Sequence, residues 1–91
     1  MKMVLNRCYG GFTISDACAE KIGLDKYDTS DAARTNPAVI KEVERDYKFA
    51  SGFCSCLRTV TIPDEVTDYE VDEYDGYESI TYVLDGKLYH A

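Results

Sequence analysis

The chain has 91 residues, of which 45% are hydrophobic and 30% are charged, and its formal net charge at neutral pH is −7. This length predicts one domain over residues 1–91 with a single modest core, and the apolar content excludes a disordered chain. No apolar run reaches the roughly 18–20 residues of a membrane helix, and the first residues lack an apolar signal region. We therefore expect a soluble, intracellular protein with reduced thiols.

The charge is distributed unevenly along the chain. Residues 1–58 carry nine basic and eight acidic side chains, whereas residues 59–91 carry nine acidic side chains and one basic one, Lys87, which gives −8. Eight of these acids fall between Asp64 and Glu78, with no Lys or Arg among them. Such a block repels nucleic acid and favours a basic partner.

The first predicted element is a short strand that begins at Val4 and runs into a double-glycine corner. We expect Gly10 and Gly11 to supply a turn with positive φ. Ser15 is a good N-cap for a short helix that ends at Gly23. Residues 24–35 lack a clear period and are predicted to form a loop, with one turn of helix over 30–34.

A longer helix is predicted from Pro37 to residue 50, because Asn36-Pro37 is a strong helix start and apolar residues follow at helical spacing. Gly52 is expected to close it, and Glu44 and Lys48 are expected to form an i,i+4 pair. Residues 54–62 are rich in Thr, Val and Ile, which predicts a strand. Arg58 interrupts the alternation of that strand, which indicates a bulge or an edge position.

The last third contains two Asp-Gly turns, Asp75-Gly76 and Asp85-Gly86, which predict a three-stranded meander. The register of the first hairpin places Tyr69, Val71, Ile80 and Tyr82 on one face, which is predicted to be the core face. Glu73 and Glu78 oppose each other on that same face, where like charges repel. We therefore expect the tip to project past the core. Glu70, Asp72, Tyr74, Tyr77, Ser79 and Thr81 form the predicted solvent face.

The predicted order of elements is β-α-loop-α-β-β-β-β, in which helices and strands are segregated. This order predicts an α+β domain with a mostly antiparallel sheet, made of the N-terminal strand and the C-terminal meander and covered by two helices. The N-terminal strand is expected to lie in or beside the sheet of the meander.

Residues with catalytic or metal-binding chemistry are few. Cys54-Ser55-Cys56 could offer two thiolates to zinc, but the spacing is unusual, so the four cysteines are better interpreted as small buried hydrophobic residues. The one histidine, His90, is expected to fray and therefore supports no nucleophile–base pair. The acids of residues 64–78 lack calcium-loop spacing. We expect no metal, no cofactor and no enzyme activity.

Two surfaces are candidates for binding. The first is the glycine corner, where Arg7, Tyr9, Gly10 and Gly11 could hold an anion or nucleotide; a purely structural turn is the favoured alternative. The second is the acidic, tyrosine-bearing hairpin, because tyrosine is favoured at interfaces and spaced carboxylates can imitate nucleic-acid phosphates. A charged surface that serves only solubility is its alternative. The hairpin candidates are Asp68, Glu70, Asp72, Glu73, Tyr74, Asp75, Tyr77 and Glu78.

Several segments resemble a widespread group of small proteins from tailed phages and prophages. They are Val4-Leu5-Asn6-Arg7-Cys8-Tyr9-Gly10-Gly11-Phe12, Arg34-Thr35-Asn36-Pro37, Ile62-Pro63-Asp64-Glu65-Val66 and Tyr69-Glu70-Val71-Asp72-Glu73-Tyr74-Asp75-Gly76. The matches follow the same order over nearly the whole chain and are weakest in residues 24–33 and after Ile80. The resemblance implies a phage origin and a location in the host bacterial cytoplasm, and it assigns no site residues.

A small acidic phage protein without catalytic residues is expected to act on host machinery. The leading hypothesis is an inhibitor that binds a host defence protein, such as a CRISPR effector, through the acidic hairpin, without contacting nucleic acid or membrane. A second hypothesis is a homo-oligomer that sequesters a nucleotide immune signal at the glycine corner. A third is a structural or replication accessory protein of the phage.

Overall fold

The computed structural model describes residues 1–91 and confirms the α+β class with antiparallel strands. Its helices are α1 (Asp16–Ile22), α2 (Asp31–Arg34), α3 (Pro37–Arg45) and α4 (Tyr47–Ala50). Its strands are β1 (Lys2–Asn6), β2 (Leu57–Thr61), β3 (Asp68–Tyr74), β4 (Tyr77–Leu84) and β5 (Lys87–His90). None of the helices has the length and apolar character that crossing a membrane requires.

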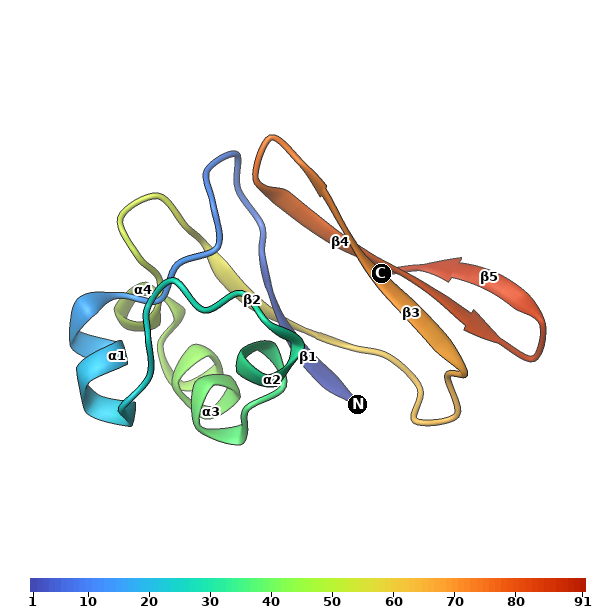
Figure 1. The fold of residues 1–91 in the computed structure, drawn as a ribbon, viewed down its shortest axis with the longest axis horizontal. Helices are drawn as coiled ribbons and strands as arrows, with labels where there is room; N and C mark the ends of the chain where they lie inside the picture. Colours follow the sequence, from blue (N-terminus) through green and yellow to red (C-terminus); the bar gives the residue numbers. More distant parts are fainter.

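The strands form two sheets rather than one. β1 pairs with β2, with Val4 opposite Thr59, whereas β3, β4 and β5 form a separate three-stranded sheet. The expectation that the N-terminal strand joins or flanks the meander is therefore wrong as to pairing, although β1 does pack against β4. In Figure 1 the β1–β2 ribbon lies between the helices and the three-stranded sheet. Helices α2, α3 and α4 pack on this ribbon, and the meander covers its other side. Side chains of α2 also reach the meander.

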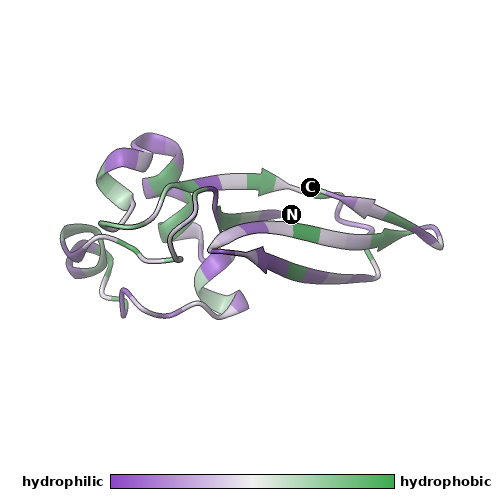
Figure 2. Ribbon diagram, turned by 90° about the horizontal axis from the view of Figure 1, so that it is seen from above, coloured by the Kyte–Doolittle hydropathy of each residue, from purple (hydrophilic) through white to green (hydrophobic).

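Alternation along β1 gives the protein a core on each side of this ribbon. Successive side chains of a strand point to opposite faces, and Met3, Val4 and Leu5 are all fully buried. Val4 belongs to the cluster on the helix side, and Met3 and Leu5 belong to the cluster on the meander side. Figure 2 shows hydrophobic and hydrophilic positions interspersed along the strands. The clusters also contain Phe12, Ile14, Cys18, Val39, Val43 and Leu57 on the helix side, and Ile62 and Ile80 on the meander side.

The helix caps follow local sequence rules. Ser15 accepts from the amide of Cys18 at 3.1 Å at the start of α1, and Gly23 ends the helix with φ +71°. Ser30 caps the short helix α2, and Asn36 caps α3, so the predicted starts of these helices are confirmed. The apolar face of α3 then packs on the ribbon through Val39 and Val43.

The helix predicted over residues 37–50 is interrupted at Asp46, which has extended dihedrals of φ −160° and ψ 92°. The Asp46 carboxylate accepts from the amides of Lys48 and Phe49, so it acts as the N-cap of α4. This break removes the expected Glu44–Lys48 pair, and Glu44 instead bonds to Lys2 at 2.9 Å. α4 ends at Ala50 with Ser51 as its C-cap, so Gly52 is not the closing residue.

Glu42 on α3 links this helix to α1. It is only 5% exposed, and its carboxylate pairs with Lys21 of α1 at 2.8 Å and with Arg45 at 2.6 Å. Hydrogen bonds from Lys21 and then Arg45 lower the pKa of the Glu42 carboxyl. The ion pairs therefore stabilise the helical layer only while Glu42 is ionised.

The strand predicted over residues 54–62 is shorter in the structure, and Arg58 occupies an edge position as expected. β2 pairs with β1 alone, so its other side is free of a neighbouring strand. The Arg58 guanidinium lies 3.3 Å from the ring centroid of Tyr47 on α4. A charged side chain in this apolar strand is therefore accommodated by wrapping over the edge onto an aromatic ring.

The glycine corner has a different cause from the one predicted. Positive φ is confined to Gly23, Gly76 and Gly86 among the glycines, so Gly10 and Gly11 do not supply a left-handed turn. Gly10 is needed because a Cβ there would overlap the carbonyl oxygen of Cys54, whereas a Cβ on Gly11 would meet open space. Close approach of two backbones, not turn geometry, requires glycine at the first of these positions.

Both Asp-Gly hairpins have the predicted register. Tyr74 pairs with Tyr77, Val71 with Ile80 and Tyr69 with Tyr82 in the first, and Tyr82 pairs with Tyr89 in the second. Asp75 and Gly76 have φ of 50° and 90°, and Asp85 and Gly86 have φ of 52° and 75°. Positive φ at both central residues is the type I′ pattern that matches the twist of two paired strands.

Candidate functional site

A buried ion pair fastens the meander to the rest of the domain. Arg34 on α2 is 4% exposed and Glu78 on β4 is 5% exposed. Arg34 donates to both Glu78 carboxylate oxygens, through Nη1 at 2.6 Å and Nη2 at 2.7 Å. The expected repulsion between Glu73 and Glu78, and with it the projection of the tip past the core, is therefore wrong. The opposite charge that neutralises Glu78 comes from a residue 44 positions earlier in the chain.

The same pair occupies the backbone edge of β1 that β2 leaves free. Arg34 Nη1 also donates to the carbonyl oxygen of Val4 at 3.2 Å, and Glu78 Oε1 accepts from the amide of Asn6 at 2.7 Å. Backbone groups buried without partners are costly, and a neighbouring strand usually satisfies them. Here two side chains take the place of that strand. This explains why β1 can be buried between two layers while pairing with a single strand.

Asn6 connects the corner, the start of β2 and the hairpin tip. It is fully buried; its Oδ1 accepts from the amide of Cys56 at 2.8 Å, and its Nδ2 donates to the carbonyls of Cys8 at 3.0 Å and Gly76 at 2.7 Å. A Cβ on Gly76 would overlap the backbone of Gly10. The tip of the β3–β4 hairpin is thus held directly against the glycine corner.

The two candidate surfaces consequently meet at Tyr77. Arg7 Nη1 donates to the Tyr77 hydroxyl at 3.2 Å, and its guanidinium lies 5.4 Å from the centroid of that ring. The Tyr9 ring lies 5.9 Å from the Tyr77 ring. Phe12 folds back into the core, but Tyr9 is 75% exposed. The corner therefore presents the side chains of Arg7 and Tyr9 beside the hairpin tip.

The corner is poorly built to cradle an anion with its backbone. The Gly11 amide donates to the carbonyl of Cys54 at 3.1 Å, and the Gly10 backbone is packed against Gly76. An anion-binding loop instead needs amides that are free to point at the ligand. The structural alternative for this corner, a tight packed turn, fits these contacts.

The hairpin presents a row of carboxylates that have no basic partner. Five acids of β3 and its turn are exposed and take part in no ion pair; they are Asp68, Glu70, Asp72, Glu73 and Asp75. Asp72 accepts from the Thr81 hydroxyl, and Glu73 accepts from the amide of Gly76 at 2.6 Å. Glu78 is a correction to the predicted surface, because it is buried against Arg34. The accessible carboxylates therefore number five rather than six. Asp68, Glu70 and Asp72 lie on the outer face of β3, Glu73 lies on its other face at the tip, and Asp75 lies in the turn.

Tyrosines surround this row in two different roles. Tyr74 is 73% exposed and Tyr77 is 37% exposed, so both predicted interface tyrosines reach the surface. Tyr69 points the other way and donates to Asp31 on α2 at 2.9 Å. This hydrogen bond to a carboxylate raises the pKa of the Tyr69 hydroxyl. Tyr69 therefore belongs to the structural contact between meander and helices.

The four cysteines are free thiols that differ in burial. Of the four thiols only Cys18 is buried, so the prediction of four buried cysteines is wrong for Cys8, Cys54 and Cys56. Burial raises the pKa of Cys18. No three His, Cys, Asp or Glu side chains are grouped as metal ligands. His90 lies within β5, with a ring nitrogen 3.1 Å from the Thr81 hydroxyl, rather than fraying.

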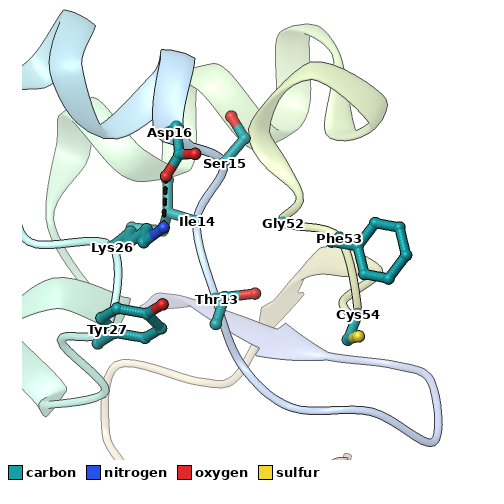
Figure 3. A pocket seen from close by; sticks show the side chains of 9 residues that line it. All are labelled: Thr13, Ile14, Ser15, Asp16, Lys26, Tyr27, Gly52, Phe53 and Cys54. Carbon is teal, nitrogen blue, oxygen red and sulfur yellow. Dashed lines mark hydrogen bonds and ion pairs between the residues drawn. The ribbon is translucent and has the colours of Figure 1, made fainter.

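One pocket, of about 450 Å³, opens between α1 and the loop before β2 (Figure 3). Its two charged residues, Lys26 and Asp16, pair with each other at 2.6 Å, and this ion pair is drawn in Figure 3. The rim carries the exposed rings of Tyr27 and Phe53. No residue of either candidate surface lines the pocket. It offers no unpaired charge and no nucleophile–base pair, so we assign it no function.

Sequence reasoning missed Arg34 and Asn6, the residues that position the hairpin. The available signal was Glu78 itself, because an acid on the predicted core face requires a cation. No family model matches the chain, and neither the curated proteins nor the solved structures contain a match. We therefore infer function from the residues of this chain and the geometry that they form.

Proposed function

We propose that this protein is a non-catalytic inhibitor that binds a basic, nucleic-acid-binding protein through the acidic face of the β3–β4 hairpin. The carboxylate row of β3, exposed and free of basic partners, is the observation that carries the proposal. Charges of one sign on a surface speed association with an oppositely charged partner and suppress other partners. The resemblance to phage proteins supports a bacterial host defence protein, in the host cytoplasm, as that partner.

The way the hairpin is held supports binding by a preformed surface. Its tip is fixed by Asn6 and by the contact between Gly76 and Gly10, and the strand next to the tip is fixed by the buried Arg34–Glu78 pair. A rigid surface loses little conformational entropy when a partner binds. Carboxylates displayed at fixed spacing on such a strand can occupy a groove that otherwise holds phosphates.

Capture from a bacterial lysate on the immobilised protein tests the proposal. Glu70 and Asp72 are the best residues for charge reversal, because Glu73 also supports the turn through the Gly76 amide. We expect Glu70→Lys with Asp72→Lys to abolish capture of a basic protein. A matched control reverses two exposed acids elsewhere, Glu20 and Glu65, and should capture as the unaltered protein does. Equal loss in both double variants would contradict a specific role for the hairpin.

A further inference from the structure

The hairpin tip and the glycine corner beside it each carry an exposed aromatic ring. Tyr9 and Tyr74 are 75% and 73% exposed, and no cation of the protein lies over either ring. Tyr77 differs from them, because Arg7 already covers its ring at 5.4 Å and bonds to its hydroxyl. The rings of Tyr9 and Tyr74 are therefore accessible to a partner, whereas Arg7 covers the ring of Tyr77.

The surroundings of Tyr74 complement a cation. Asp72 shares the outer face of β3 with Tyr74, and Asp75 follows it in the turn. Neither carboxylate is paired with a basic residue, and the hydrogen bond from Thr81 holds Asp72 in place. A cation placed over the ring would therefore meet both the aromatic face and a free carboxylate.

The interior of the protein shows which cation this combination favours. The Arg34 guanidinium lies 4.3 Å from the centroid of the Phe12 ring while both its terminal nitrogens donate to Glu78. A guanidinium is planar, so it can lie on a ring and donate two parallel hydrogen bonds in its own plane. The ammonium group of lysine is a compact, strongly hydrated charge and cannot do both.

We propose that the hairpin tip recognises arginine side chains, with Tyr74 and Tyr9 each stacking a guanidinium from an arginine-rich segment of the partner. Asp72 and Asp75 accept hydrogen bonds from the arginine on Tyr74. This inference rests on the proposed function and adds the chemistry of the partner segment. General attraction to basic proteins comes from the carboxylate row, and preference for arginine over lysine comes from the two tyrosines.

Synthetic hexa-arginine and hexa-lysine peptides, of equal charge, separate these two contributions. We expect the unaltered protein to bind hexa-arginine about three- to tenfold more tightly than hexa-lysine, as measured by calorimetry at low salt. Tyr74→Leu should remove most of this preference by weakening hexa-arginine alone, and Tyr74→Phe should retain it. Tyr27→Leu changes an exposed tyrosine outside the hairpin and should leave both affinities unchanged.

The outcomes distinguish this inference from the function on which it rests. Equal affinity for the two peptides, or equal weakening of both by Tyr74→Leu, would overturn arginine recognition and leave a general acidic binding face. Binding of neither peptide would contradict the proposed function as well. Concentration-dependent dimerisation that Tyr74→Leu abolishes, measured by sedimentation, would assign the tip to a second copy of this chain and would also overturn the inference.

Discussion

The buried Arg34–Glu78 pair should be worth more to this protein than an ordinary buried ion pair. Many such pairs can be replaced by apolar residues of similar size without loss of stability. This one also satisfies the carbonyl of Val4 and the amide of Asn6, which no strand covers. Methionine at both positions removes the charges together but leaves these two backbone groups without partners. Comparing the two single variants with the double variant therefore separates the charge effect from the backbone effect.

The structure gives the expected magnitudes. Arg34→Met or Glu78→Met alone leaves one buried charge unpaired, which costs about 3–5 kcal/mol of unfolding free energy. The double variant leaves no charge unpaired, but each orphaned backbone group costs about 1–3 kcal/mol. We therefore expect the double variant to be less stable than the unaltered protein. We also expect it to be more stable, by about 4 kcal/mol, than the sum of the two single effects implies.

Urea unfolding followed by circular dichroism measures these free energies, and an osmolyte such as trimethylamine N-oxide keeps the weakest variants folded. Additive single effects would refute the coupling between the two charges. A double variant as stable as the unaltered protein would refute the role of the pair as a substitute for a neighbouring strand.

Four further variants test local features of the fold. Gly10→Ala should lower the thermal midpoint by several degrees because its Cβ overlaps Cys54, whereas Gly11→Ala, which meets open space, should leave it within about a degree. Asp46→Ala removes the N-cap of α4 and should cost about 1 kcal/mol in urea unfolding, and full retention of stability would contradict the capping role. Because the ion pairs lower the pKa of Glu42, they stabilise the folded protein fully at pH values above the ordinary glutamate pKa of about 4.3. This stabilisation is lost as the pH falls through the lower pKa of the folded state. Glu42→Gln should therefore be less stable than the unaltered protein at neutral pH and should approach it on acidification; a constant difference at all pH values would contradict this assignment.

Local sequence signals predicted the parts of the fold whose causes are local. The Asp-Gly turns and the alternation around them determine the register of both hairpins, because each contact joins residues close in sequence. Ser15, Asn36 and Gly23 likewise bond to backbone groups within their own helical turns. The break at Asp46 was missed because apolar spacing continues across it, although an aspartate can always cap a following turn.

The arrangement of the candidate site could not be predicted in the same way. Glu78 has no basic residue near it in sequence, and only the fold brings Arg34 beside it. The pairing of β1 with β2 joins segments more than 50 positions apart, and nothing local specifies it. Because the hairpin tip is placed by these distant contacts, the meeting of Tyr9, Tyr77 and Arg7 at one surface was also not predictable.

Release of nucleic acid from the captured partner tests the proposed inhibition most directly. We expect the unaltered protein to displace bound nucleic acid from that partner in proportion to its concentration, as followed by fluorescence anisotropy of a labelled oligonucleotide. The variant with Glu20→Lys and Glu65→Lys should displace it equally well, and the variant with Glu70→Lys and Asp72→Lys should not displace it. Simultaneous binding of oligonucleotide and unaltered protein to the partner, or equal displacement by both double variants, would contradict the proposal.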